Sequence, residues 1–434
     1  MTSSSSSRPR LPRTVLLCAM LAAGSSAVWA DDPIPYYIGA SQTETADTNV
    51  FRLPEGRPHP RDLISTTALI AGLNQPLGRG RLTADLQLNA NYFKNNDNLN
   101  NNGGQGNVKL DWETINRISG DLALRQQKSL YRSNPSYQQV VTERDLLTNT
   151  GANAHLRIGM VTALSLDGGV SYDKARHSSS LQAQQDLDQT AGNIGVRWRP
   201  SSLWNARLGW RETRAEYPRY SVDPVTGDFT SDKIHRRDID LSGGWAPSGN
   251  SQLDARISST RTSHTNSNGG GDGNIWTGLL GYNLQLSGKS SVRLQVSRDT
   301  DVGNSDADFQ LVNPQTNAVA FGNTSSSNTR LRNSVLVNGK WQATSKIALD
   351  TSYSYSRRKL ANNYNQTVGG ITQVLTETDY DSFNVASLGL TYNPTQSLQL
   401  GCKYTHEEMN AALNVLYTSP YKADTGSCYL QFRL

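Results

Sequence analysis

Arginines alternate with large apolar residues in the stretch VRWRPSSLWNARLGW, residues 196–210. In an extended segment successive side chains point to opposite faces. One face therefore carries Arg197, Arg199 and Arg207, and the other carries tryptophan and leucine. Cationic side chains gathered on one face attract anions or pair with carboxylates. They carry out no covalent chemistry by themselves, so the pattern predicts an electrostatic role.

Residue types that perform catalysis or hold metals are sparse. The six histidines and three cysteines are scattered without metal-ligand spacing, and phosphate loops, CxxC pairs and nucleophile elbows are absent from the sequence. His177 lies near Asp173, as in a hydrolase, but a solvated histidine is the simpler interpretation. We predict no enzyme, no catalytic residue, no metal and no cofactor. The net charge of +5 is too mild to indicate a nucleic-acid partner.

The first thirty residues have the pattern of a secretory signal. Three arginines between positions 8 and 13 precede the apolar run Val15–Ala23, and Val28-Trp29-Ala30 ends on a small residue. The run is too short for a transmembrane helix. We expect residues 1–30 to be a signal peptide and residues 31–434 to form the exported protein.

The remainder repeats a period of two rather than a helical period. In RLTADLQLNANYF, Leu82, Leu86 and Leu88 share one face, while Asp85 and Gln87 share the other. Similar segments recur along the whole chain, with the first beginning near Tyr36. Alternation over about ten residues is typical of a strand with one apolar and one polar face.

The connections between these segments are of two kinds. Short turns rich in Pro, Ser, Gly, Asn or Thr follow an aromatic residue, as in RWRPSSLW and TYNPTQSL. The other connections are longer and rich in Asn and Gly. Examples are residues 94–107, 133–145, 221–232, 266–274 and 301–328.

Short turns at one end and long loops at the other are typical of a bacterial outer-membrane β-barrel. We predict an all-β, antiparallel, up-and-down transmembrane barrel of about 18 strands, with short periplasmic turns and long extracellular loops. A secreted β-sandwich or solenoid is the alternative, but it would need polar side chains in its core. Barrels of about this width leave room for an aqueous channel.

Aromatic residues near both strand ends predict two belts at the membrane interfaces. The expected periplasmic belt is Trp198, Trp204, Trp245, Trp341 and Tyr392. The expected outer belt is Tyr92, Tyr172, Trp210, Tyr355 and Tyr404.

The opposite parity assigns charged residues to the lumen. The pore-lining candidates are Arg125, Arg197, Arg199, Arg207, Arg256, Arg293, Asp85, Asp121, Asp167, Asp240, Asp254 and Asp350. Several of the aspartates follow a short turn closely, so we expect a low ring of carboxylates. Two interpretations stay open: a charged constriction that selects solutes, or salt bridges that satisfy a polar wall.

Two cysteines remain after removal of the signal peptide, Cys402 and Cys428. Parity places both toward lipid on the last two strands. Antiparallel pairing brings Cys428 opposite roughly Cys402 to Tyr404, so a disulfide is one possibility. Two free cysteines serving as small apolar residues are the other.

One stretch points to a family. The sequence TADTNVFRLPEG, Thr45–Gly56, with the hairpins that follow it, resembles the opening of EpsL-type outer-membrane proteins. These are porin-like barrels associated with exopolysaccharide and exosortase gene clusters. The resemblance covers about the first eighty exported residues and transfers no catalytic residue. It implies a part in producing or exporting an extracellular polysaccharide.

Three function classes follow: a channel for exopolysaccharide, a general or small-solute porin, and a non-transporting barrel whose loops serve adhesion or assembly. We expect the bacterial outer membrane as the location. The expected partners are the lipid bilayer with lipopolysaccharide and the outer-membrane insertion machinery. The first function class adds polysaccharide and periplasmic export components.

Overall fold

Antiparallel strands account for most of the chain that the computed structural model describes. The described residues are 35–114, 117–132, 142–159, 163–222, 226, 228–265, 273–300, 310–312, 319–321, 331–368, 371–411 and 420–434. The expected signal peptide lies outside this set. Residues Tyr36–Leu434 form one unit, to which the following account refers. Among the described residues, no helix has the length and apolar character needed to cross a membrane.

The strands of the first half are β1 (Tyr36–Asp47), β2 (Asp62–Leu77), β3 (Gly80–Phe93), β4 (Asn101–Glu113), β5 (Ile118–Leu130), β6 (Leu146–Ile158), β7 (Leu164–His177), β8 (Leu187–Trp198), β9 (Trp204–Val222) and β10 (Phe229–Ser248). Those of the second half are β11 (Ser251–His264), β12 (Gly273–Ser287), β13 (Ser290–Thr300), β14 (Gln310–Val312), β15 (Val319–Phe321), β16 (Leu331–Trp341), β17 (Ile347–Val368), β18 (Ile371–Tyr392), β19 (Leu398–Ala411) and β20 (Tyr421–Arg433). Two short 3-10 helices, η1 (Asp97–Leu99) and η2 (Ser180–Gln185), lie in connections.

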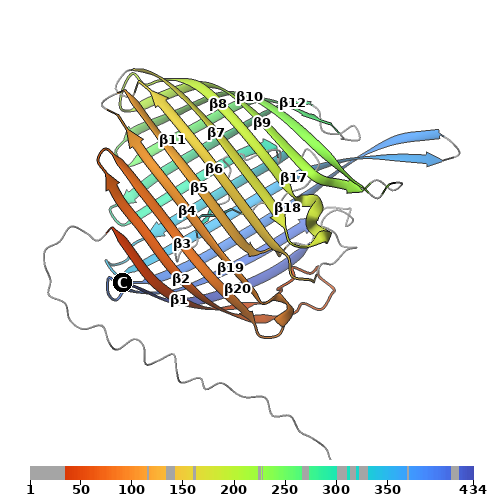
Figure 1. Ribbon diagram of the computed structural model, residues 1–434, viewed down its shortest axis with the longest axis horizontal. Helices are drawn as coiled ribbons and strands as arrows, with labels where there is room; N and C mark the ends of the chain where they lie inside the picture. The colour runs from red at the N-terminus through yellow and green to blue at the C-terminus, as the bar shows by residue number, and fades with distance from the viewer. Residues whose placement is uncertain are drawn as a thin grey trace, which may run out of the picture. The chain divides into compact units, whose positions relative to one another are not determined.

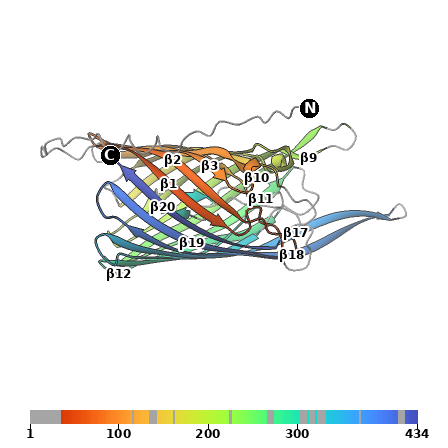
Figure 2. The same cartoon turned by 90° about the horizontal axis from the view of Figure 1, so that it is seen from below.

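Eighteen of these strands form one sheet that closes on itself (Figures 1 and 2). Each strand pairs antiparallel with the next along the chain, and β1 pairs with β20, for example Ala40 opposite Phe432. Among the described residues, strands β14 and β15 pair only with each other, outside the 18-stranded sheet. The predicted up-and-down barrel of about 18 strands is confirmed.

The outer surface of the barrel is apolar. Leucine, valine and tryptophan side chains alternate outward along the strands; Leu208, for example, is 60% exposed. Exposing so many large apolar side chains to water would be costly, whereas lipid accommodates them. A closed sheet also satisfies every backbone polar group within the bilayer. The barrel is therefore an outer-membrane barrel, and the bacterial outer membrane is its location.

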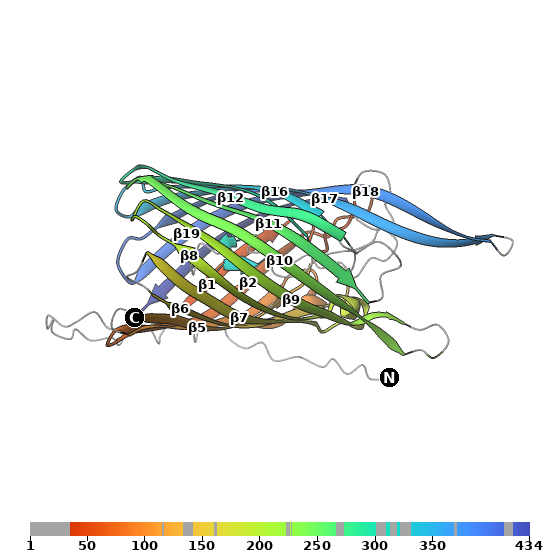
Figure 3. The same cartoon turned by 90° about the horizontal axis from the view of Figure 1, so that it is seen from above.

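The two ends of the barrel differ as predicted. Short turns such as Gly249–Asn250 and the turn at residues 342–346 join strands at one end, which is the periplasmic end in barrels of this class. At the other end β17 and β18 continue past the rim as a long hairpin (Figure 3).

For two of the loops predicted from Asn and Gly content, the predicted extent is too long. Residues 101–107 of the expected 94–107 loop belong to β4, and residues 221–222 and 229–232 of the expected 221–232 loop belong to β9 and β10. Composition favoured a loop there, but pairing to neighbouring strands supplies the backbone hydrogen bonds. The 133–145, 266–274 and 301–328 loops fall largely outside the described residues.

Residues of both expected aromatic belts lie on the outer face. Trp198, Trp204, Trp245, Trp341 and Tyr392 are exposed near the periplasmic strand ends, and Trp198 packs edge-on against Trp204 at 4.8 Å between ring centroids. In the outer belt Tyr92, Tyr172, Trp210 and Tyr404 are exposed, while Tyr355 is half-buried.

The two cysteines are joined. Cys402 of β19 lies directly opposite Cys428 of β20, and a disulfide connects them. Both residues are exposed on the same face as Leu430, the lipid side that parity predicted. Of the two possibilities that the sequence left open, the structure has the bonded one.

Candidate functional site: the polar barrel interior

Contacts between non-neighbouring strands identify the inner face of the barrel. The Nη2 atom of Arg125 on β5 lies 2.6 Å from Oδ1 of Asp173 on β7. The Nη1 atom of Arg236 on β10 lies 3.0 Å from Oδ1 of Asp299 on β13. Side chains two or three strands apart converge only on the concave side of a closed sheet. The polar face is therefore the lumen side.

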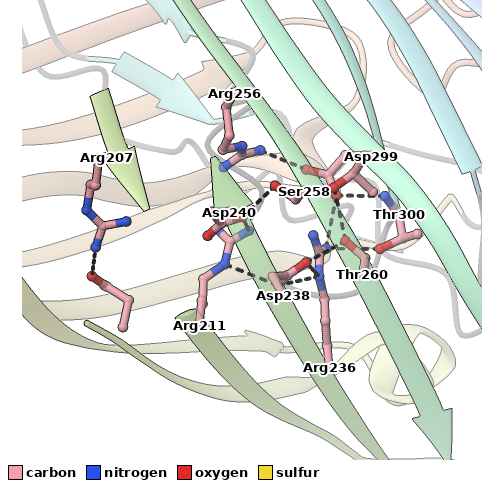
Figure 4. Close-up of polar contacts among 12 residues, drawn as sticks. Arg207, Arg211, Arg236, Asp238, Asp240, Arg256, Ser258, Thr260, Asp299 and Thr300 are labelled. Carbon is pink, nitrogen blue, oxygen red and sulfur yellow. Dashed lines mark hydrogen bonds and ion pairs between the residues drawn. The ribbon is translucent and has the colours of Figure 1, made fainter. Parts of the chain in front are cut away.

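A network of paired charges covers the inner face of β9 to β13 (Figure 4). We call it the charged wall; its ionic members are Arg211, Arg236, Arg256, Asp238, Asp240 and Asp299. Hydroxyl groups of Ser258, Thr260 and Thr300 join it. Three guanidinium groups face three carboxylates, so the wall is close to neutral.

Asp238 is the most connected member of the charged wall. Nε of Arg236 donates to both of its carboxylate oxygens at 3.0 Å, and Nε of Arg211 donates at 3.2 Å. The Thr260 hydroxyl donates to it at 2.5 Å. The side chains of Arg236 and Asp238 are 3% and 0% exposed. Because buried charges must be paired, these groups are occupied with one another.

A second group of charges lies at the periplasmic end of β6 to β9. We call it the arginine cluster: Arg157, Arg197 and Arg207 around Asp167, with Arg199 near Arg197. Nε of Arg207 lies 2.7 Å from Oδ2 of Asp167, and Nε of Arg197 lies 3.7 Å from Oδ1. Arg157 lies directly opposite Asp167 in the register. Four arginines and one carboxylate make this part of the lumen electropositive.

Two glycines make room for Arg207. A Cβ atom on Gly195 would lie 2.5 Å from Cζ of Arg207, and one on Gly209 would lie 2.2 Å from its Nη1 atom. The guanidinium therefore packs directly against the backbone at Gly195 and Gly209. Any larger residue at either position would displace it from Asp167.

The other predicted pore-lining residues are distributed around the inner wall. Arg293 donates to Gln295 at 3.1 Å, Tyr37 donates to Asp85 at 3.3 Å, and Gln252 donates to Asp254 at 3.2 Å. His155 lies 3.7 Å from Asp121, and Asp350 lies opposite Lys340. The structure brings Asp167 together with Arg197 and Arg207, and Asp240 with Arg256 through the charged wall. The expected low ring of carboxylates stays a prediction.

A third region of the inner face was not singled out as a site from the sequence, although alternation put Gln87 on the polar face. We call it the amide wall: Gln87, Asn89 and Asn91 of β3, Asn101 and Gln105 of β4, and Gln127 of β5. Gln87, Gln105 and Gln127 follow one another directly across three strands. Asn91 donates to Asn101 at 2.9 Å and accepts from Thr66 at 2.8 Å. The sequence signal for this wall was the run of Asn and Gln at alternate positions of β3. The glycines among residues 103–106, however, suggested a loop instead of the paired strand β4.

The amide wall lines a half-open cavity of about 240 Å³. Its lining is mostly uncharged and polar, with Phe93 and Arg132 toward the extracellular end. Each primary amide offers two donors and one acceptor oxygen. Such a surface suits a ligand that carries many hydroxyl groups.

The segment with the family resemblance folds over the extracellular end of the amide wall. Val50, Phe51 and Leu53 pack with Ile64, Phe93 and Leu99 in a small apolar core. Asn49 holds the bend by accepting from the Leu53 amide at 2.8 Å and donating to the Lys422 carbonyl at 3.0 Å. The motif residues are therefore structural, and they bridge β20 to the first strands.

Arg52 is the charged centre of this segment. It has a φ of 53°, which an L residue adopts only when its surroundings hold it there. Its Nη1 atom donates to both oxygens of Asp47 at 2.9 Å, and its Nε donates to Glu407 at 2.8 Å. Burial alone would lower the pKa of Arg52, but Glu407 and Asp47 together raise it above its ordinary value. Arg52 therefore stays charged and ties β19 to β1.

His177 pairs with a different carboxylate from the one expected. Its Nδ1 atom lies 2.6 Å from Oδ2 of Asp145, not beside Asp173, which pairs with Arg125. Both side chains are buried, so the expectation of a solvated histidine is wrong. Among the described residues, no group of three or more His, Cys, Asp or Glu side chains is placed to hold a metal ion.

Comparisons with known proteins assign no family and no function to the chain. No family model and no curated protein matches the chain. Among solved structures, OccAB3 of Acinetobacter baumannii is similar at 11% identity and a TM-score of 0.45, over 92% of this chain and 99% of that one. The outer membrane protein opdK of Pseudomonas aeruginosa is similar at 11% identity and a TM-score of 0.44, over 92% and 98%. The FrpB iron transporter of Neisseria meningitidis is similar at 10% identity and a TM-score of 0.47, over 86% and 62%. These values are too low to transfer a function, and the fold rests on the strand pairing itself.

Proposed function

We propose that this protein is an outer-membrane channel that takes part in exopolysaccharide production or export. Three features support the proposal. An 18-stranded barrel is wide enough for an aqueous passage. Part of its inner face is lined with neutral amides, and residues 45–56 resemble the EpsL-type barrels.

The amide wall is the observation that carries the proposal. Its side chains donate and accept hydrogen bonds without a net charge, and they surround a cavity of about 240 Å³. Selectivity in wide pores depends on the donors, acceptors and charges that line them. An amide-rich lining with few charges favours a solute with many hydroxyl groups over a small ion.

The arginine cluster favours a second candidate, a porin for small anionic solutes. Arg197 and Arg207 share Asp167, and Arg157 and Arg199 add further positive charge near the periplasmic opening. Fixed charges of one sign attract solutes of the opposite sign. An acidic polysaccharide would use both regions, whereas a small anion would need only the cluster.

Current through single channels in planar bilayers separates these candidates. For an exopolysaccharide channel we expect a conducting pore that the organism's own polysaccharide blocks and short neutral sugars do not. Asn89→Leu should weaken this block several-fold, because it removes a central amide of the cavity lining. Ser352→Leu, on the inner face of β17 and outside the cavity lining, is the matched control and should leave the block unchanged.

Two results would contradict the proposal. A pore that selects small anions and ignores the polysaccharide would leave the porin as the better function. A protein that does not conduct at all would point to a closed barrel with a scaffolding or adhesive role.

A further inference from the structure

Two arginines face each other on the outside of the barrel. Arg237 of β10 lies directly opposite Arg261 of β11 in the register. They share the parity of Ile239 and Ile257, whose side chains are exposed on the lipid face, and both arginines are exposed themselves. Directly opposed residues have Cβ atoms about 4.5–5.5 Å apart, and like charges at this spacing destabilise a sheet. The pair therefore has an unfavourable repulsion that an anion between the two guanidinium groups would remove.

The height of this pair corresponds to the lipid headgroups. Ile239 and Ser259 lie two residues closer to the periplasmic end than Arg237 and Arg261. Ile239 lies opposite Trp210, and Ser259 lies opposite Trp276. Both tryptophans are exposed. Aromatic side chains mark the interface between the hydrocarbon core and the headgroups. Arg237 and Arg261 lie just beyond them, on the extracellular side.

Among the described residues, the neighbours of the two arginines form no ion pair with them. Glu212 lies opposite Arg237 and attracts its charge, but its hydrogen bonds come from Nε and Nη2 of Arg214 at 3.2 and 3.0 Å. His235 lies opposite Arg214 in the next row. Across β11, the residue opposite Arg261 is the neutral Asn274. Within the part of the chain that the structure describes, neither Arg237 nor Arg261 has a carboxylate within 4.0 Å.

We propose that Arg237 and Arg261 bind a phosphate group on the headgroup of a phosphorylated glycolipid in the outer leaflet. Two guanidinium groups offer bidentate hydrogen bonds to phosphate oxygens, which are strong because both partners are charged. The exposed ring of Trp276 beside this site contacts the upper part of the acyl chains. A lipid satisfies both contacts, whereas free phosphate satisfies only the first.

Native mass spectrometry of the detergent-purified barrel tests the site with diphosphoryl lipid A as the probe. We expect one lipid A to remain bound to the wild-type protein. The double variant Arg237→Gln/Arg261→Gln should bind it at least about tenfold more weakly, since charge-assisted hydrogen bonds are lost. The matched control is Arg357→Gln/Lys359→Gln, which removes two outward-facing cations of β17 and should keep wild-type affinity.

The stability of the lipid-free proteins is a second measurement. Removal of the repulsion predicts that Arg237→Gln/Arg261→Gln unfolds at the same temperature as wild type or higher, as read from heat-modifiable gel mobility. If this variant fails to assemble, the single variant Arg261→Gln gives the same comparison.

Several outcomes would overturn the proposal. Equal lipid A affinity in the wild type and the β10–β11 variant would remove the arginine pair from the site. An equal loss in the β17 control would show attraction by net charge alone. Displacement of lipid A by an equal concentration of inorganic phosphate would identify a site for free phosphate instead.

Discussion

The amide wall and the charged wall use their polar groups differently. In the charged wall Arg236 and Asp238 are almost fully buried, and both hydrogen-bond to other members of that wall. In the amide wall Gln87, Asn89 and Gln105 line a cavity, and their amides are uncharged. Polar side chains on an inner face can thus hold neighbouring strands together through buried charges, or through uncharged groups that also line a cavity. Composition alone does not tell these two roles apart.

The largest expected effect comes from breaking the charged wall. Arg236→Met removes the guanidinium that lies between Asp238 and Asp299 and leaves two buried carboxylates without their main partner. Removal of one partner of a buried ion pair costs about 3–5 kcal/mol. We expect a matching fall in the free energy of unfolding, measured by denaturant titration of the refolded barrel.

Gln87→Leu in the amide wall is the comparison for that variant. Gln87 is held by a hydrogen bond from Gln105 at 3.3 Å and no charge is left unpaired, so the cost should be about 1 kcal/mol. Equal losses in the two variants would mean that the walls do not differ in the way described.

A second prediction compares the inner and outer faces. Leu208→Arg puts a charge among lipid-facing side chains and should cost about 2–4 kcal/mol. Asn89→Arg, on the amide wall, should be tolerated and should shift ion selectivity toward anions. Unfolding titrations and reversal potentials measure these effects, and equal destabilisation would show that the faces are assigned wrongly. Gln295 is a poorer site for the same test, because it is buried and accepts from Arg293.

A third prediction concerns pH and the loops at the extracellular end. Burial by itself would raise the pKa of Asp145. The hydrogen bonds that its carboxylate accepts from His177 and from the backbone amide of Ser179 have a larger combined effect, so the pKa is lowered. A carboxyl whose pKa is lowered by folding contributes stability above its ordinary pKa and loses it as the pH falls through the folded value. We therefore expect faster amide exchange around residues 178–186 as the pH falls below about 4.

Asp145→Asn is the control for the pH prediction. It removes the titrating group, so exchange around η2 should already be fast near neutral pH and should change little on acidification. An unchanged acid response in this variant would assign the effect to another group.

The smallest expected effect is in the arginine cluster. Arg207→Gln removes the closest partner of Asp167, but Arg197 and Arg157 stay beside that carboxylate. We expect anion selectivity to fall a few-fold, with little change in stability, as measured by reversal potential in a salt gradient. Unchanged selectivity would mean that the cluster has only a structural role.

The period of two in the sequence was sufficient to predict which residues face lipid and which face the lumen. Leu86 and Gln87, or Leu208 and Arg207, lie on the faces that alternation assigned them, because a strand has only two faces. Aromatic residues and short turns likewise marked the periplasmic strand ends. These are local properties of the chain, and closure of the sheet does not change them.

Only the tertiary structure decided which polar side chains meet. Arg236 reaches Asp299 across two intervening strands because the closed sheet is concave on that side, and no local pattern encodes such a contact. The exact opposition of Cys402 and Cys428 depends on the register of β19 and β20. Residues 103–106 read as a loop by themselves, yet strands β3 and β5 hold them in β4, because hydrogen bonds from both neighbours outweigh the local preference of glycine. Alternation assigns a face to each side chain, whereas curvature and register assign its partner.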